Sequence, residues 1–222
     1  MVWQVLVIAI ISYLIGSINP SIILSKLIKK EDIRTKGSGN AGTTNTLRVL
    51  GKGPAAIVLL IDVLKAVVAV LLGSWIGTLG NYSQEAFAQL HDYALMASSI
   101  GVILGHNFPI YYGFKGGKGV ATSLGVLLVV EWKIGLVCLI FALLLMIVSR
   151  MVSLGSITAA LLYPVLVFVL GTAFNNKWLY LAFAIVLALL VIIRHRANIK
   201  RLLSGTENKL WETKAEKKAK LK

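Results

Sequence analysis

The chain has 222 residues and is 57% hydrophobic but only 14% charged. Its apolar runs approach the roughly 20 residues that cross a bilayer, which excludes a water-soluble domain and indicates an all-α integral membrane protein. In a membrane protein, a net charge of +14 reflects loop orientation and contact with anionic membrane lipid, so we expect no nucleic-acid partner.

The first predicted helix covers residues 3–24, and Pro20 is expected to bend or open it. The start, MVWQVLV, has no positively charged region and no small-residue cleavage site, so we expect a retained span and not a signal peptide. A polar segment follows at residues 26–52, with seven Lys and Arg and the run GSGNAGTTN at 37–45. This run matches a dinucleotide-binding fingerprint in letters only, because a basic loop precedes it and not a buried strand.

The second predicted helix covers residues 54–76 and contains Asp62 and Lys65 on one face. Each charge costs about 2.5–3.5 kcal/mol at mid-membrane, so we expect the two side chains to pair or to face a polar cavity. A loop is predicted at residues 80–90, and the third helix at residues 91–104.

A glycine-rich stretch, GHNFPIYYGFKGGKGVAT at residues 105–122, leads into the next apolar run. Because glycine lacks a Cβ, the amides of Gly116, Gly117 and Gly119 can converge on an anion at a helix N-terminus, with Lys118 beside them. A flexible turn with a snorkelling lysine is the alternative. The stretch is not a P-loop, because Gly119 stands where Ser or Thr would hold Mg²⁺.

The apolar run at residues 120–130 is too short to cross the membrane as an ordinary span. Residues 118–149 therefore form either one long helix or two helices that turn at residues 131–133. With two helices, the basic loops share one side, and only Lys133 and Lys177 lie in loops on the other. The positive-inside rule then favours seven transmembrane helices with the N-terminus outside and the C-terminus cytoplasmic.

Three further apolar runs, at residues 134–148, 154–170 and 178–193, complete the predicted bundle. Residues 1–208 are thus expected to form a single seven-helix membrane domain. Residues 209–222 are Lys-rich and are expected to form a basic cytoplasmic tail.

In this topology the segments rich in Gly, Ser, Asn, His and basic residues all fall on the cytoplasmic face. Their convergence would create a pocket of hydrogen-bond donors with few carboxylates, which suits a dianionic phosphate. Adjacent apolar helices would hold an acyl chain, so the pattern indicates transfer of a lipid-soluble group onto a small phosphorylated molecule. The residues expected to converge are Ser38, Asn40, Thr44, Asn45, Arg48, Lys118, Ser156, His195 and Asn198.

No metal and no cofactor are expected. Cys138 is the single cysteine, and the sequence offers no carboxylate pair or Cys/His cluster with ligand spacing. Among the histidines, His91 is predicted to lie near a helix end and His106 to hold its own loop. His195, flanked by two arginines, is the one expected to take part in chemistry.

The polar segments resemble the PlsY family of bacterial acyl-phosphate:glycerol-3-phosphate acyltransferases. The likeness lies in GSGNAGTTN at 37–45, the stretch at 105–122 and HRANIKRLLSGTEN at 195–208, with DVLK at 62–65 and SLGS at 153–156. It implies a seven-helix fold and transfer of a fatty acyl group from acyl phosphate to the 1-hydroxyl of sn-glycerol 3-phosphate. It also implies the bacterial inner membrane, with the active site on the cytoplasmic face.

By this resemblance, Lys118, His195, Asn198 and Ser38 are expected to be catalytic. His195 and a substrate phosphate oxygen are both candidates to accept the hydroxyl proton. A transporter of organic phosphates and a basic membrane anchor are the rival classes. The residues expected to bind substrate are Arg48, Thr44, Asn45, Gly116, Gly117, Gly119, Ser156 and Glu207.

Overall fold

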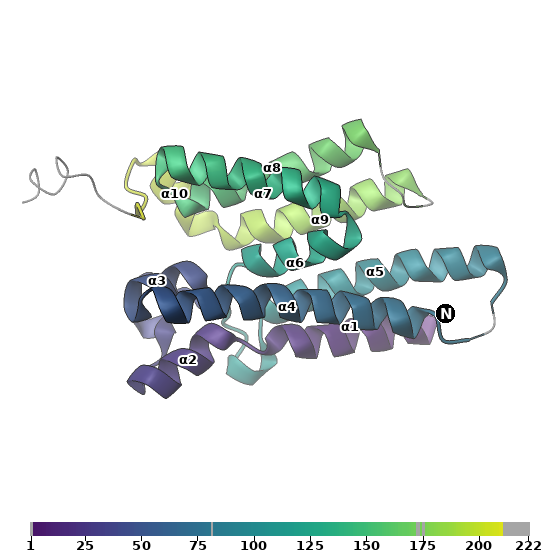
Figure 1. Cartoon of the computed structure of the whole chain (residues 1–222), viewed down its shortest axis with the longest axis horizontal. Coiled ribbons are helices and arrows are strands. Elements are labelled where there is room, and N and C mark those ends of the chain that lie inside the picture. Colours follow the sequence, from purple (N-terminus) through teal and green to yellow (C-terminus); the bar gives the residue numbers. More distant parts are fainter. Residues whose placement is uncertain (1, 81, 172–173, 175, 211–222) are drawn as a thin grey trace, which may run out of the picture.

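The computed structural model describes residues 2–80, 82–171, 174 and 176–210, and every regular element in those residues is a helix (Figure 1). The predicted basic tail lies outside the described residues from residue 211 onward. In chain order the helices are α1 (Val2–Ser17), α2 (Pro20–Lys29), η1 (Ile33–Thr35), α3 (Thr43–Leu50), α4 (Lys52–Gly77), α5 (Gln84–Asn107), η2 (Ile110–Tyr112), α6 (Val120–Val130), α7 (Trp132–Ser149), α8 (Val152–Leu170), α9 (Lys177–Arg194) and α10 (Arg196–Leu203).

Six helical stretches of the described chain are long and apolar enough to cross a membrane. They are α1 with α2, α4, α5 with η2, α7, α8 and α9. The remaining apolar helix, α6, has 11 residues and a length of about 16 Å, roughly half of a hydrocarbon core. The all-α membrane fold is therefore confirmed, whereas seven crossings and their orientation stay predictions.

Residues 118–149 form two helices and not one. Glu131 leaves the helical conformation, with φ −150° and ψ 70°, between α6 and α7. A Cβ placed on Gly135 would lie 2.9 Å from Cβ of Leu127, although eight residues of continuous helix span about 12 Å. The chain thus folds back at Glu131, and α7 returns alongside α8 toward the end where α6 begins (Figure 1).

Polar caps set the boundaries of the N-terminal elements. Asn19 accepts a hydrogen bond from the Ile22 amide at 3.1 Å, and Pro20 follows as the first residue of α2, so the predicted opening at Pro20 is confirmed. The predicted loop at residues 80–90 is wrong. Ser83 caps the amide of Ala86 at 3.3 Å, and α5 already begins at Gln84.

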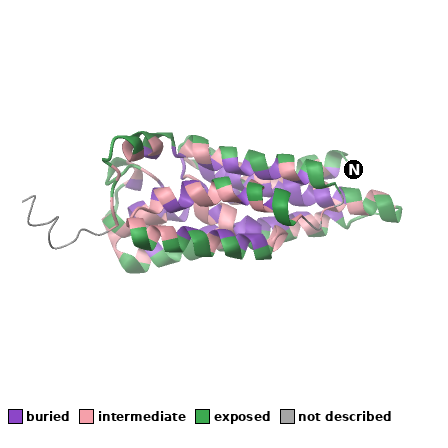
Figure 2. Cartoon of the chain, turned by 90° about the horizontal axis from the view of Figure 1, so that it is seen from above, coloured by how far each residue is buried: buried purple, intermediate pink, exposed green. Residues whose placement is uncertain are grey.

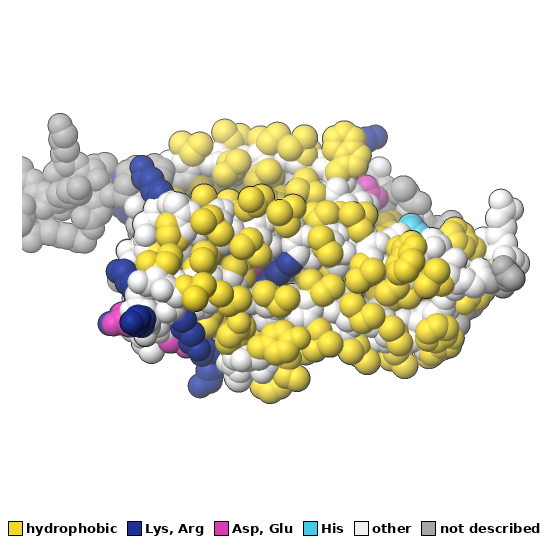
Figure 3. Space-filling view, turned by 60° about the horizontal axis from the view of Figure 1, so that its bottom comes forward, with side chains coloured by type: hydrophobic (Ala, Val, Ile, Leu, Met, Phe, Trp, Pro, Cys, Tyr) yellow, Lys and Arg dark blue, Asp and Glu magenta, His cyan; other side chains and the backbone are white. Residues whose placement is uncertain are grey.

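The helices form two groups with α6 between them (Figure 1). One group contains α1, α4 and α5, and the other contains α7, α8 and α9. Buried residues face the interior of this assembly, whereas large apolar side chains cover its outside (Figures 2 and 3). Leu60 and Val68 of α4, for example, are more than half exposed, as expected for side chains that face lipid.

Candidate functional site

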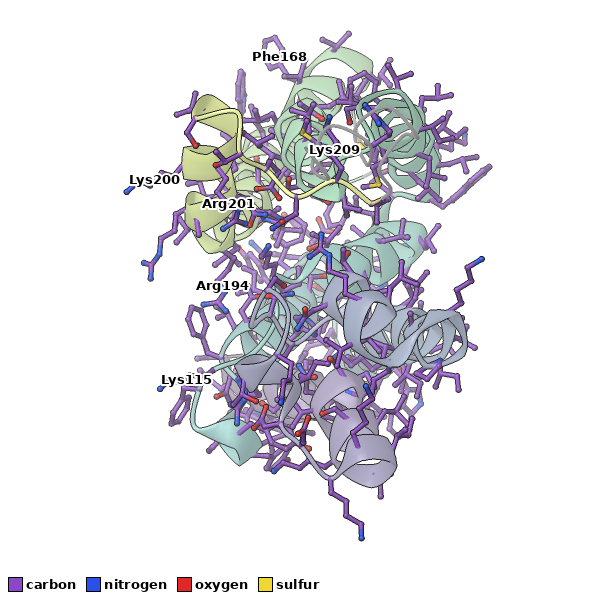
Figure 4. All side chains as sticks on the ribbon, turned by 90° about the vertical axis from the view of Figure 1, so that its left-hand side faces the viewer. Lys115, Phe168, Arg194, Lys200, Arg201 and Lys209 are labelled. Carbon is purple, nitrogen blue, oxygen red and sulfur yellow. The ribbon has the colours of Figure 1, made fainter. Side chains whose placement is uncertain are left out.

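A cavity of about 440 Å³ lies between the two helix groups and has one polar and one apolar region. Ten of the twelve predicted site residues border it, although they come from four separate chain segments. The polar region lies at the end of the bundle that carries α3 and α10, which faces the viewer in Figure 4. These predicted residues are Ser38, Thr44, Asn45, Arg48, Lys118, Gly119, Ser156, His195, Asn198 and Glu207.

Lys118 stands directly before the N-terminus of α6 and joins a chain of hydrogen bonds with α10 and the segment after it. Its Nζ donates to Oδ1 of Asn198 at 2.5 Å, and Nδ2 of Asn198 donates to Oε1 of Glu207 at 2.8 Å. The other carboxylate oxygen of Glu207 accepts from Nε of Arg201 at 2.9 Å. Glu207 therefore fixes the orientation of the Asn198 amide so that its oxygen faces the lysine.

The positive charge of Lys118 is only partly compensated. Burial lowers the pKa of Lys118 to about 8, and the nearby cations Arg201 and Arg48 act in the same direction. Burial also lowers the pKa of the Arg48 guanidinium. In Figure 4, Arg201 points toward the centre of this end, while Lys115 and Lys200 point away from it. A desolvated cluster of cations of this kind favours a dianionic ligand.

His195 lies at the junction of α9 and α10 and is 2% exposed. Its Nδ1 is 2.8 Å from the carbonyl oxygen of Val191, which can only accept, so Nδ1 carries the proton and Nε2 keeps its lone pair. Burial, followed by the charge of Lys118, lowers the pKa of His195 to about 4. The imidazole is therefore neutral at pH 7 and able to accept a proton at Nε2.

Asn45 organises the loop that carries Ser38. Its Nδ2 donates to the carbonyls of Ile33 and Lys36 at 3.1 and 3.0 Å, and its Oδ1 accepts from the Ser38 amide at 2.8 Å. Asn45 is fully buried, and its side-chain amide forms these hydrogen bonds with backbone groups. Although it was predicted to bind substrate, its contacts in the structure are those of a residue that positions the loop.

The three predicted glycines have different surroundings. The amides of Gly116 and Gly117 donate to the carbonyls of Asn107 and His106, at 3.2 and 3.1 Å. Neither glycine borders the cavity, whereas Gly119 does. The expectation that all three amides bind an anion is therefore corrected for Gly116 and Gly117. Glycine is needed at 117 because a Cβ there would run into the His106 ring.

Arg194 also holds the loop that carries Lys118, although the sequence did not indicate it as a site residue. Its Nε donates to the Gly117 carbonyl at 3.0 Å and its Nη2 to the Gly116 carbonyl at 3.1 Å. Its guanidinium also lies 5.0 Å from the centre of the Phe108 ring. The backbone immediately before Lys118 is thus held against the end of α9.

A buried cluster beneath this loop contains Lys65, Asp62 and His106. Nζ of Lys65 lies 2.8 Å from Oδ1 of Asp62, 3.0 Å from Nδ1 of His106 and 2.8 Å from the carbonyl oxygen of Ile18. The predicted Asp62–Lys65 ion pair is confirmed, and the histidine is a third partner that the sequence did not indicate. The His106 carbonyl also accepts a hydrogen bond from the Gly117 amide. The cluster therefore supports the loop that carries Lys118.

Several hydroxyls complete the polar region. Ser156 is buried on the first turns of α8 and donates to the Val152 carbonyl at 2.9 Å. Within the described chain, the buried hydroxyls of Thr43, Ser123 and Ser153 have no hydrogen-bond partner, and all three residues border the cavity. Such groups are ready to bind a ligand oxygen, and sequence reasoning missed all three.

The apolar region of the cavity extends between α6, α7, α8 and α9. In the described residues no three His, Cys, Asp or Glu side chains are grouped so that they could hold a metal ion. With cations in its polar region and hydrocarbon side chains in its apolar region, the cavity can bind an anion at one end and a hydrocarbon chain at the other. The apolar lining includes Leu124, Leu127, Cys138, Leu139, Ala142, Leu143, Met146, Ala159, Ala160, Tyr163, Leu187 and Ala188.

Comparison with protein families gives a match over most of the chain. Residues 6–205 match the family described as glycerol-3-phosphate acyltransferase. A glycerol-3-phosphate acyltransferase of Halalkalibacterium halodurans is 47% identical over 203 residues, covering 91% of this chain and 94% of the relative. One from Shouchella clausii is 45% identical over 218 residues, covering 97% of this chain and all of the relative.

Two solved structures have the same fold. The chain is similar to a crystal structure of PlsY, an integral membrane glycerol 3-phosphate acyltransferase, in its glycerol 3-phosphate form. The TM-score is 0.78 and the identity 38%, with 92% of this chain and 94% of the other covered. The lysophosphatidic acid form of PlsY gives a TM-score of 0.76 at 37% identity and the same coverage.

Proposed function

Because the chain belongs to the glycerol-3-phosphate acyltransferase family of integral membrane proteins, we propose that it transfers a fatty acyl group from acyl phosphate to the 1-hydroxyl of sn-glycerol 3-phosphate. The products are lysophosphatidic acid and inorganic phosphate. The observation that carries this proposal is the continuity of the cavity, in which a cationic region joins directly to an apolar one. One substrate is a phosphorylated polar molecule and the other an acyl phosphate, so both ends of the cavity have an occupant.

The chemistry requires little acid or base assistance to the leaving group. Acyl phosphate is a mixed anhydride, and its phosphate leaves when the glycerol hydroxyl oxygen bonds to the acyl carbon. Positioning and electrostatic stabilisation should therefore supply most of the rate. Lys118 and Arg48, with the hydroxyls of Ser38 and Ser156, are placed to hold phosphate and to stabilise the charge that develops in the transition state.

Two groups fit the role of proton acceptor. One is Nε2 of His195, which is neutral at pH 7 because burial holds its pKa near 4. The other is an oxygen of the substrate phosphate. His195→Gln keeps a polar side chain but no titrating base, so it should lower kcat by about 10²–10⁴ if the imidazole takes the proton. A loss of less than tenfold would assign the proton to the phosphate.

We further propose that the protein lies in the bacterial cytoplasmic membrane, with seven crossings and the cavity mouth in the cytoplasm. Lys and Arg gather at the cavity end of the molecule (Figure 3), which the positive-inside rule places in the cytoplasm. Trp3, Trp75 and Trp178 mark the opposite ends of α1, α4 and α9, and all three are more than half exposed. Tryptophan is enriched at membrane–water interfaces, which supports this placement of the boundaries.

The decisive test is turnover by the purified protein in detergent micelles. Palmitoyl phosphate and glycerol 3-phosphate should give lysophosphatidic acid and phosphate in equal amounts. A transporter of organic phosphate would instead move glycerol 3-phosphate unchanged into proteoliposomes and form no lipid. Transport without product would contradict the acyltransferase proposal.

A further inference from the structure

The lining of the apolar region stops partway along each of the helices α6, α7, α8 and α9. Counted away from the polar region, its last lining residues are Leu127 on α6, Gly135 on α7, Tyr163 on α8 and Leu187 on α9. Beyond them, Ile134 on α7, Val167 on α8 and Ala184 on α9 belong to the buried core, and Val130 of α6 packs against it. The apolar region is therefore a closed slot at this level and not a channel through the bundle.

Tyr163 is the bulkiest side chain at this closed end, and it is held rigidly. It is 3% exposed, and its hydroxyl lies 2.7 Å from the hydroxyl of Tyr180, which is fully buried on α9. The Tyr180 ring stacks on Phe174 at a centroid distance of 4.0 Å and lies 5.5 Å from the Phe183 ring. Displacing the Tyr163 ring would break a buried hydrogen bond and disturb a packed aromatic group.

The length of the slot follows from helix geometry. On α8, Tyr163 lies seven residues beyond Ser156, which places it about 10 Å deeper along the helix axis. On α7, the lining extends over eleven residue steps from Met146 to Gly135, about 16 Å. Ala160 and Ala159 line the stretch of α8 before Tyr163, so the slot stays wide enough for a hydrocarbon chain until the tyrosine closes it.

We propose that Tyr163, held in place by Tyr180, sets the longest acyl chain that the enzyme uses efficiently. The inference rests on the proposed function, because it concerns the acyl donor of that reaction. A chain that fits the slot places its carbonyl carbon among the cations of the polar region. A longer chain meets the tyrosine ring first, which holds the carbonyl away from the attacking hydroxyl.

The test compares kcat/KM for a series of acyl phosphates, from decanoyl to arachidoyl, in the wild-type protein and three variants. Tyr163→Ala deepens the slot and should raise the ratio of long-chain to optimal-chain kcat/KM by tenfold or more, in line with the effect of one or more methylenes in a fitted pocket. Tyr163→Phe keeps the ring and should keep the wild-type profile, although it loses the bond to Tyr180. Ala160→Phe fills the slot one turn earlier and should shift the optimum to shorter chains.

The alternative is that long tails leave the slot sideways into the lipid. In that case Tyr163→Ala and Ala160→Phe would keep the wild-type chain-length profile, and the inference would be overturned. If Tyr163→Ala fails to fold, as judged by thermal unfolding, the shift expected for Ala160→Phe decides alone. Absence of turnover by the wild-type protein with every acyl phosphate would overturn the proposed function itself, and this inference with it. An active wild type with unshifted variants would overturn only the role of Tyr163.

Discussion

Lys118 donates a hydrogen bond to Asn198 at 2.5 Å, although the two residues are 80 positions apart in the chain. The lysine precedes α6, which lies between the helix groups, and the asparagine belongs to α10 at the end of the second group. Neither segment forms the cationic site alone. We therefore expect the binding of phosphate to depend on the contact between the two parts of the bundle.

Lys118→Ala should lower kcat/KM by about 10²–10³ while the protein keeps its helix content, because one charge-assisted contact to the transition state is lost. Lys115→Ala is the matched control, since Lys115 lies in the same loop but is exposed and points away from the cavity (Figure 4). Steady-state kinetics in micelles measures both. Near-wild-type turnover by Lys118→Ala would remove this residue from the site.

The pH dependence of kcat/KM should show a loss of activity on the alkaline side. In the proposed mechanism the cationic form of Lys118 is the active one. Its pKa is lowered to about 8, so the free enzyme should lose this charge as the pH rises through that value. Bound phosphate stabilises the cation, so the corresponding limb of kcat should lie at higher pH. In Lys118→Arg the alkaline loss of kcat/KM should disappear from the measurable pH range, even if the rate is reduced, because arginine stays charged there. An unchanged limb in this variant would assign the titration to another group.

Gly117→Ala should impair the enzyme through shape and not through charge. The added Cβ would come within 2.6 Å of the Ala41 carbonyl and would meet the His106 ring, so the backbone before Lys118 has to move. Gly53→Ala is a suitable control, because nothing lies within 4 Å of its added Cβ. We expect at least a tenfold lower kcat/KM for Gly117→Ala and wild-type kinetics for the control. Equal kinetics in both would show that the tight loop is dispensable.

Lys65→Met should destabilise the fold by about 3–5 kcal/mol, because Asp62 is left buried without its charge partner. The double variant Asp62→Leu with Lys65→Met removes both charges and should cost less than the sum of the single changes. Thermal unfolding in a fixed detergent gives the comparison. Additive losses would mean that the two side chains do not interact energetically.

Orientation can be tested by labelling single cysteines in a Cys138→Ser background. Cysteines at Gly80 and Lys177 should react with an impermeant thiol reagent in intact cells, whereas those at Lys29 and Lys209 should not. Labelling at Lys209 but not at Lys177 would reverse the proposed position of the C-terminus. It would also mean that α6 and α7 together cross the membrane once and not twice.

Much of the architecture was predictable because its signals are local. Long apolar runs predicted the membrane-spanning helices, and Pro20 predicted the break after α1. The charged residues at 131–133 predicted the turn between α6 and α7. The start of α5 was missed because residues 84–90 are too polar for a membrane span, although Ser83 caps them as a helix.

The candidate site was predictable as a set of segments but not as a set of contacts. Motif chemistry brought together most of the residues around the cavity, yet the roles of Gly117 and Asn45 depend on which backbone groups lie opposite them. Arg194 was missed for the same reason, since its carbonyl partners are 77 and 78 positions away. Ser153 became notable only when the cavity beside its hydroxyl was known.

The central claim is that phosphate is the leaving group of the acyl donor and that a site made of cationic and polar side chains holds it. The most direct measurement gives purified enzyme palmitoyl phosphate or palmitoyl-CoA, each with glycerol 3-phosphate in EDTA, and follows lysophosphatidic acid. A thioester is less activated than an acyl phosphate and does not place a phosphate against Lys118 as the leaving group. We predict rapid formation of lysophosphatidic acid from palmitoyl phosphate, unaffected by EDTA, and little from palmitoyl-CoA. Equal rates from the two donors, or complete loss of activity in EDTA, would contradict this account.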